Sequence, residues 1–370
     1  MNPPLVDRST ARIDVRPPVP GPDMGRRRLV AAWFWTGAAL TFLILIIGGI
    51  TRLTQSGLSI VDWQPFIGVV PPIGEAQWQE TFDRYRQFPE YQQLRPGMTL
   101  SEFKFIFFWE YLHRLAARLI GVVFLVPFAL FKWRGYLDRR LTRRSLALFA
   151  LGGLQGFMGW FMVTSGLYEQ PHVSHYRLAI HLSIAFTIFA CCVWFALDLQ
   201  DRPALRMQQD ARRRLTRLVA AVGVLLAVQI FWGALVAGLD AGYIFNTFPL
   251  MGGSLVPVSL LALEPALRNF VENPATVQWI HRVLGTALAL SAVYALMRAR
   301  RVAPDDSAVV HLSMVVVLLV TLQYLFGVVT LLLHVPVALG VLHQATAMVL
   351  FGTWLALLHR LRSGQATPLR

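Results

Sequence analysis

Eight long apolar runs constrain the fold of this chain more than any other feature. Each run is about 20 residues or longer, which is the length that a helix needs to cross the hydrocarbon core of a bilayer. They cover roughly 29–50, 105–131, 144–165, 176–198, 215–238, 276–298, 308–332 and 337–359. The 370 residues are 55% hydrophobic and only 15% charged, unlike an average soluble domain. The sequence therefore predicts an all-α membrane protein with eight transmembrane helices.

The net charge of +14 is concentrated beside the ends of these runs. Basic clusters occur at 26–28, 132–144, 210–217, 298–301 and 359–362, which is every second connection. This distribution is the positive-inside pattern, so we expect both termini to be cytoplasmic. The clusters are then expected to contact anionic headgroups of the lipid bilayer, and we predict no nucleic-acid partner.

Composition also suggests the domain boundaries. Residues 1–28 contain PPVPGPD and no apolar period, which predicts a disordered cytoplasmic tail. We expect an N-terminal four-helix bundle at 29–200, a cytoplasmic linker at 201–214, a C-terminal bundle at 215–362 and a tail at 363–370. The only cysteines, Cys191 and Cys192, are neighbours in the fourth run and point apart, which excludes a structural disulfide and a cysteine metal site.

The two halves of the chain repeat each other. GGITRLTQSGLS (48–59) aligns with GALVAGLDAGYI (233–244), and LQGFMGW (154–160) aligns with LQYLFGV (322–328). The pair His113-Arg114 matches His281-Arg282, and His181 matches His343. Because each half crosses the membrane four times, the repeats run parallel, and they predict two tandem, pseudo-symmetric four-helix bundles.

Four histidines inside the apolar runs recur between the halves, on the second and fourth helices of each half. These helices are diagonal neighbours in an up-down bundle, and the first-half histidines lie roughly 8–12 Å below the outer surface. A pair of imidazoles at similar depth favours axial ligation of a haem iron. A proton pathway is the alternative, but only Glu110 is clearly placed inside the membrane. Zinc or copper would usually need further ligands, which the apolar walls do not offer.

Glu110 breaks the repeat. It precedes His113 by three residues and so shares its helix face, whereas the second half has Gln278 at this position. The difference suggests that one site performs chemistry and the other supplies electrons; an interfacial carboxylate paired with an arginine is the alternative. Five arginines lie near the outer span ends. Taken singly, each is expected to snorkel to headgroups, but as a group we expect some of them to bind haem propionates: Arg52, Arg114, Arg118, Arg177 and Arg282.

Nearly the whole chain resembles the haem A synthase family of bacterial and mitochondrial membranes. The resemblance rests on GGITRLTQSGLS, EYLHR (110–114), LQGFMGW, LAIHL (178–182), QWIHR (278–282) and GVLHQ (340–344). EYxHR together with the repeated histidines is a specific signature. The resemblance implies a fused pair of four-helix bundles that oxidises the C8 methyl of haem O to the formyl of haem A for terminal oxidases.

The resemblance also implies roles for single residues. His113 and His181 would face the iron of the substrate haem O, His281 and His343 would ligate the iron of a haem b cofactor, and Glu110 occupies the essential carboxylate position. Implied surroundings are the bacterial inner membrane, haem O synthase, cytochrome oxidase assembly factors and an electron donor that the sequence does not identify. A homo-oligomer remains open.

One subgroup of the family carries a cysteine pair in an external loop. This chain has none there, which groups it with the proteobacterial-type members. Two other functions would also use four intramembrane histidines. A di-haem membrane cytochrome that only transfers electrons explains the histidines but not the difference between Glu110 and Gln278. A haem carrier predicts ready exchange of haem with an acceptor.

Overall fold

The computed structural model describes residues 22–61, 69–167, 171–201, 203–205 and 207–363, and eight helices in these ranges are long and apolar enough to cross a membrane. Apart from isolated bridges, all regular structure in these ranges is helical. The predicted class, an all-α membrane protein with eight spanning helices, is thus confirmed. The eight helices are α1 (Pro22–Leu53), α3 (Leu100–Trp133), α4 (Arg139–Leu167), α5 (His175–Asp198), α6 (Gln209–Gly238), α8 (Pro274–Val302), α9 (Ser307–Leu332) and α10 (Val337–Ser363).

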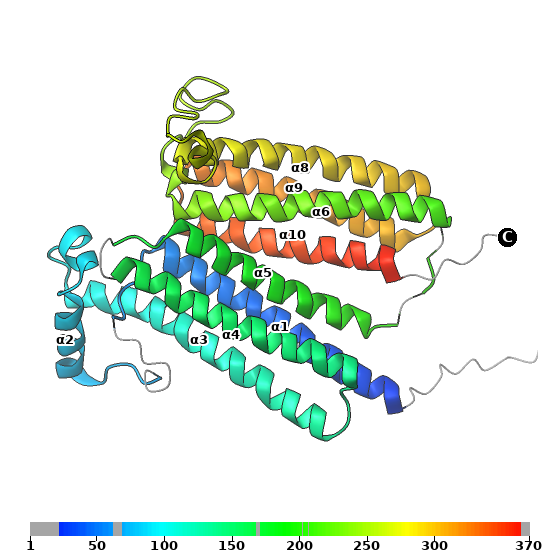
Figure 1. Ribbon diagram of the computed structural model, residues 1–370, viewed down its shortest axis with the longest axis horizontal. Coiled ribbons are helices and arrows are strands. Elements are labelled where there is room, and N and C mark those ends of the chain that lie inside the picture. Colours follow the sequence, from blue (N-terminus) through cyan, green and yellow to red (C-terminus); the bar gives the residue numbers. More distant parts are fainter. Residues whose placement is uncertain (1–21, 62–68, 168–170, 202, 206, 364–370) are drawn as a thin grey trace, which may run out of the picture.

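Each half of the chain forms a unit of four helices, and the two units lie side by side (Figure 1). In the first unit α1 contacts α3 and α5, and α4 contacts the same two helices, so that α3 and α5 lie across from one another. The second unit repeats this order: α8 and α10 lie across from one another, between α6 and α9. The histidine-bearing helices therefore occupy the diagonal positions that the repeat predicts. Helices α1, α5, α6 and α10 form the contact between the units.

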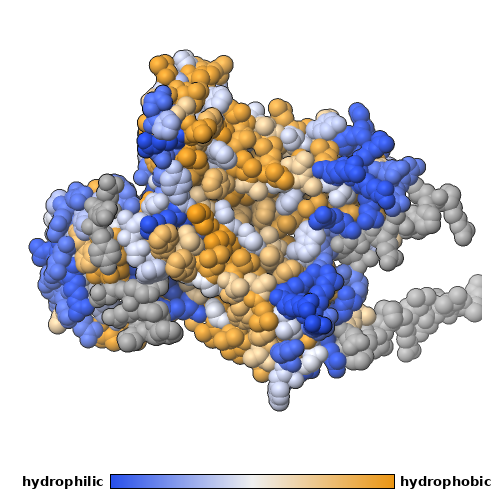
Figure 2. Space-filling model, viewed as in Figure 1, coloured by the Kyte–Doolittle hydropathy of each residue, from blue (hydrophilic) through white to orange (hydrophobic). Residues whose placement is uncertain are grey.

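The two ends of the molecule differ. Helix α1 begins and α10 ends at the same end, on the right of Figure 1, and the basic clusters at the helix ends gather there. We call this the basic end and the opposite one the loop end. Figure 2 shows an apolar band across the helices between hydrophilic surfaces at these two ends. This distribution is the one expected for a protein that spans a bilayer.

Short helices lie in the two long connections at the loop end. The first connection holds α2 (Gly74–Tyr85) and η1 (Glu90–Leu94), and the second holds η2 (Ala241–Tyr243), η3 (Ala266–Arg268) and α7 (Asn269–Glu272). The following membrane helices have defined starts. Thr99 and Glu102 form a reciprocal capping box at α3, and the Asn273 side chain caps α8, which begins with Pro274. These caps set where the two histidine-bearing helices leave the connections.

The predicted N-terminal tail is too long. Helix α1 already begins at Pro22, so residues 22–28 are helical rather than part of a disordered segment. Proline is favoured in the first turn of a helix, and the arginines that follow have good helix propensity, which outweighs the absence of an apolar period. Residues 1–21 and 364–370 lie outside the described residues, and the tails assigned to them stay predictions.

Contacts at both ends join the two units. At the loop end Arg52 of α1 donates to the carbonyl of Ala237 and to Asp240 at the end of α6, each at 2.8 Å. At the basic end Asp198 of α5 contacts His359 of α10 at 2.7 Å. The units also pack closely between these two ends, because a Cβ on Gly49 of α1 would lie 2.6 Å from the Gln344 side chain of α10. The units therefore form one packed body, with the candidate site between them.

Candidate functional site

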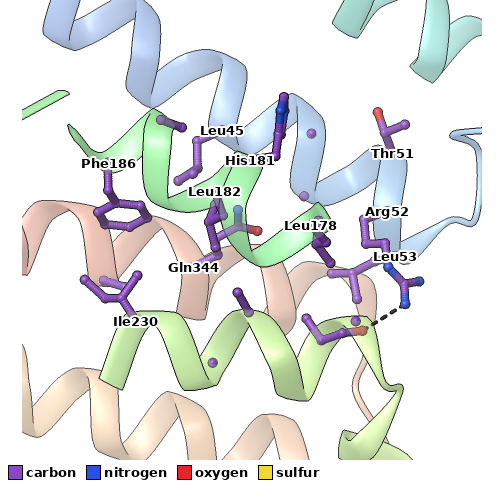
Figure 3. Close-up of a pocket in the computed structure, with 18 of the residues that line it drawn as sticks. Leu45, Thr51, Arg52, Leu53, Leu178, His181, Leu182, Phe186, Ile230 and Gln344 are labelled. Carbon is purple, nitrogen blue, oxygen red and sulfur yellow. Dashed lines mark hydrogen bonds between the residues drawn. The ribbon is translucent and has the colours of Figure 1, made fainter. Parts of the chain in front are cut away.

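A single cavity of about 1510 Å³ extends through both units and is lined by all four predicted histidines. Its walls are mainly apolar. Figure 3 shows one region, in which Phe186 of α5 lies beside Ile230 of α6, while His181 of the same helix points away from α6. Glu110 lines the same cavity. The structure thus brings together the five residues that the sequence singles out most strongly.

Each of the four histidine rings faces a glycine on the neighbouring helix. A Cβ added to that glycine would approach the ring Cε1 to 3.2 Å or less, closer than nearly all real contacts of this kind. Only glycine therefore leaves the ring where it lies. The pairs, with the distance from the added Cβ to Cε1, are Gly48–His113 (2.9 Å), Gly159–His181 (3.2 Å), Gly233–His281 (3.1 Å) and Gly327–His343 (2.9 Å).

Three of the histidines also have a glutamine partner. The glutamine lies four residues before the facing glycine, so both present the same helix face to the ring. The distances between the amide nitrogen and the imidazole Nε2 are 3.1 Å for Gln155–His181, 3.4 Å for Gln229–His281 and 3.2 Å for Gln323–His343. On α1 the corresponding residue is Ile44, so His113 lacks this contact. The Nδ1 atoms of all four rings are buried without a hydrogen-bond partner among the described residues.

Glu110 is 3% exposed and accepts three hydrogen bonds. Its Oε2 accepts from the Ser59 hydroxyl at 2.7 Å and from the backbone N–H of Ile60 at 2.8 Å. Its Oε1 accepts from Arg114, one helical turn further along α3, at 2.6 Å. Arg114 in turn donates to the carbonyl of Ile60 at 3.0 Å. The carboxylate is thus held rigidly between α3 and the segment that follows α1, with donors on both oxygens.

The matching position of the second unit donates a hydrogen bond to the loop-end segment where Glu110 accepts one. Gln278 donates through Nε2 to the carbonyl of Ala241 at 2.9 Å, where Glu110 accepts from the corresponding segment of the first unit. Arg282 donates to the carbonyl of Phe245 at 2.9 Å, as Arg114 does to Ile60. The scaffold is therefore similar in both units, but only the first one has an anionic group beside its histidine.

The structure separates the five arginines that we considered as propionate partners. Arg52, Arg114, Arg118 and Arg282 line the cavity. Figure 3 shows Arg52 at its edge, with its hydrogen bond toward α6. Arg177 does not line it: its guanidinium lies 3.6 Å from the centre of the Phe161 ring and donates to the Phe161 carbonyl. A propionate role for Arg177 stays a prediction without support from this geometry.

Fold and site together define a class of protein: a helical membrane protein with two pairs of histidines around one shared intramembrane cavity. Among the described residues no group of three or more His, Cys, Asp or Glu side chains could hold a metal ion.

The chain belongs to the COX15-CtaA family of cytochrome oxidase assembly proteins, whose family model matches residues 31–355. This confirms the family resemblance.

Individual relatives are similar to this protein in sequence over most of the chain. A heme A synthase of Nitrosospira multiformis is 43% identical and aligns with 90% of this chain and 93% of its own length. A heme A synthase of Rhodospirillum centenum is 48% identical over 90% and 89% of the two chains. A heme A synthase of Sinorhizobium medicae is 45% identical, covering 88% of each.

Two parts of the site were not identified from the sequence. The glutamine partners do carry a signal, because Gln-x-x-x-Gly occurs three times within the apolar runs, ending at Gly159, Gly233 and Gly327. Glu90, a second carboxylate that lines the cavity, carries none, since it lies in a connection of ordinary composition. Its burial depends on how α2 and η1 pack against α3.

Proposed function

We propose that this protein is a haem A synthase, an oxidoreductase that converts the C8 methyl of haem O into the formyl of haem A in successive steps. One observation carries the proposal: two matched histidine pairs line one cavity, and only the first has a buried carboxylate beside it. The names of the relatives support the same activity.

The residues present fit haem. Each histidine has a buried ring nitrogen without a partner among the described residues, and a facing glycine leaves space beside each ring. In this proposal His113 and His181 face the iron of substrate haem O, while His281 and His343 hold haem b through its iron. When bound, haem b supplies a one-electron redox centre. Propionates can pair with Arg52, Arg114, Arg118 and Arg282, which already line the cavity.

Glu110 is the residue that this proposal places next to the reacting methyl. Its three donors fix the position of the carboxylate before substrate binds, so no reorganisation is needed when charge develops. A fixed negative charge stabilises positive charge that develops on the oxidised substrate, and it orients a hydroxylated intermediate by hydrogen bonding. Gln278 is neutral and cannot do the first of these.

A difference in wall structure supports the assignment of the first unit to substrate. Helices α3 and α4 barely touch, and Gly152, Gly153 and Gly156 of α4 face open space within the cavity wall. In the second unit α8 and α9 pack closely, and Tyr324 replaces Gly156 and contacts Thr286 of α8 through its hydroxyl at 3.1 Å. An open wall suits a lipophilic substrate that must enter and leave, whereas a closed wall suits a resident cofactor.

The setting follows from the proposal. The basic end would face the cytoplasm and the loop end the opposite side of a bacterial inner membrane, as the positive-inside pattern predicts. The two units at 29–200 and 215–362 would hold substrate and cofactor respectively. Haem O synthase and cytochrome oxidase assembly factors are the partners that this activity implies.

The direct test is extraction of haems from membranes of cells that supply haem O, followed by separation and mass measurement. We expect haem A with the intact chain and none with Glu110→Ala, which should retain both haems. Absence of haem A with the intact chain would refute the synthase activity. Two redox-cycling haems without any modified haem would instead identify an electron-transferring cytochrome.

A further inference from the structure

A second carboxylate, Glu90, lies at the loop end of the same cavity that contains Glu110. It is the first residue of η1 and is only 4% exposed. One oxygen, Oε1, lies 3.7 Å from Nε of Arg95. The other, Oε2, has no hydrogen-bond partner among the described residues. A buried carboxylate oxygen without a donor costs free energy, so its retention suggests a role.

The surroundings of Glu90 combine a buried hydroxyl with an apolar wall. Tyr85, the last residue of α2, is fully buried, and its hydroxyl also lacks a partner among the described residues. Arg95 anchors η1 to the end of α1 by donating to the carbonyls of Thr54 and Gln55. Aromatic side chains of α2, η1 and α3 surround this group: Phe82, Tyr91, Phe103 and Phe107. The result is a buried pocket in which the Tyr85 hydroxyl lies close enough to the Glu90 carboxylate to influence its protonation.

Three groups around Glu90 influence its proton affinity: Tyr85 of α2, Arg95 after η1 and Glu110 of α3. The pKa of Glu90 is raised to about 7, mainly by burial; the charge of Arg95 lowers it, the charge of Glu110 raises it and the Tyr85 hydroxyl lowers it. Burial and the neighbouring Glu90 raise the pKa of Tyr85 as well, so that this hydroxyl remains neutral. At neutral pH both forms of Glu90 are therefore populated, which is the condition for efficient proton exchange.

Glu110 is poorly suited to that exchange. Both of its oxygens already accept hydrogen bonds, from Ser59, Ile60 and Arg114, and protonation would have to break at least one of them. Glu90 has a free oxygen at the same cavity. The two carboxylates thus differ in whether their oxygens already accept hydrogen bonds. This difference suits Glu110 to a fixed position and Glu90 to carrying a proton.

We propose that Glu90 is the proton-exchanging residue of the first-unit cavity, while Glu110 is its fixed carboxylate. The inference rests on the proposed function, because oxidation of a methyl to a formyl moves protons between the cavity and the aqueous phase whatever the oxygen source. In the step itself a hydronium ion in the cavity gives its proton to the Glu90 carboxylate, so that water remains and a carboxylic acid forms. The acid then returns the proton to water at the loop end, and no electrons move.

Infrared titration of the purified, haem-loaded protein tests the proton site without requiring turnover. We expect the carbonyl band of a protonated carboxyl group to appear as the pH falls through about 7. It should be absent in Glu90→Gln and remain in Glu110→Gln, there with a lower midpoint because a neighbouring negative charge is gone. A band that persists unchanged in Glu90→Gln, or no band that titrates near neutrality, would overturn the proposal.

The pH profile of haem A formation tests the coupling to chemistry. Glu90→Gln should reduce the rate at least tenfold and abolish its pH dependence near neutrality, whereas Glu90→Asp should retain a shifted profile. Glu80→Gln is the matched control, since Glu80 is an exposed carboxylate on α2. Its loss should change neither the rate of haem A formation nor the pH dependence of that rate. A wild-type rate and profile in Glu90→Gln would refute the role in catalysis.

Tyr85→Phe is a second variant that tests the pocket even if the Glu90 variants do not fold. It preserves the packed ring and removes only the hydroxyl, so the infrared midpoint should move upward. An unchanged midpoint would contradict the pocket described above. A titrating band in a protein that makes no haem A would refute the synthase activity while leaving the proton site intact, so the two failures are distinguishable.

Discussion

Replacing Glu110 by Gln gives the first unit the side chain that the second unit has at Gln278. The two environments are not equivalent, however. The oxygens of Glu110 meet three donors, whereas the Gln278 amide meets the carbonyl of Ala241. In Glu110→Gln the single amide oxygen can keep the contact with Arg114. The NH₂ group then faces the N–H of Ile60, so that two donors oppose each other.

The expected cost follows from these contacts. A hydrogen bond to a charged group contributes about 1.5–3 kcal/mol, and the Ile60 bond is lost. The Arg114 ion pair, 14% and 3% exposed, becomes a bond to a neutral amide. Together these changes should destabilise the protein by about 2–4 kcal/mol, which lowers Tm by several degrees. Both haems should remain bound, because no histidine is changed.

Two assays on purified protein check this prediction. Thermal unfolding should show the lower Tm, and haem extraction should show haem O and haem b without haem A. The matched control is Gln278→Glu, which places a carboxylate against the Ala241 carbonyl; it should lower stability but leave haem A formation in place while haem b remains bound. Haem A formation at the wild-type rate in Glu110→Gln would refute the reasoning.

Three further predictions follow from the site. Gly156→Tyr should close the wall between α3 and α4 and reduce haem O conversion without loss of haem b, while Tyr324→Gly should make haem b dissociate faster, both measured by haem content after dilution. Gly327→Ala should displace the His343 ring and broaden or shift the haem b absorption spectrum, because the added Cβ would lie 2.9 Å from Cε1. The pKa of Glu90 rises from 4.5 to about 7 on folding. Its contribution to the free energy of unfolding is therefore fully present below pH 4.5 and is lost as the pH rises through 7, by up to about 3 kcal/mol. Thermal unfolding across this range should show a pH dependence that Glu90→Gln lacks.

The sequence predicts the membrane helices and the helices on which the four histidines lie, and it does so for physical reasons. Apolar length is dictated by bilayer thickness, so the eight helices could be found from hydropathy alone. The repeat then placed His113 and His181, and likewise His281 and His343, on diagonal helices without any knowledge of packing. The helix ends were less predictable, because the polar turns of α1 and α6 outside the apolar runs continue the helix without any apolar signal.

Features that depend on tertiary contacts could not be predicted in this way. Glu90 is an ordinary loop residue until α2 packs against α3 and removes it from water. Arg177 looks like the other span-end arginines, yet its guanidinium lies over Phe161 rather than in the cavity. Three glycines of α4 lie at the open wall between α3 and α4, but in a sequence glycines in membrane helices usually indicate close packing instead. Only the structure shows that these face open space.

The central claim is that chemistry takes place in the first unit and that the second holds a resident haem b. The most direct measurement is the haem composition of purified His113→Ala and His281→Ala, determined by mass from cells that supply haem O. We expect His113→Ala to keep haem b and form no haem A, and His281→Ala to lose haem b. Loss of haem b in His113→Ala, or its retention in His281→Ala, would contradict the division between the two units.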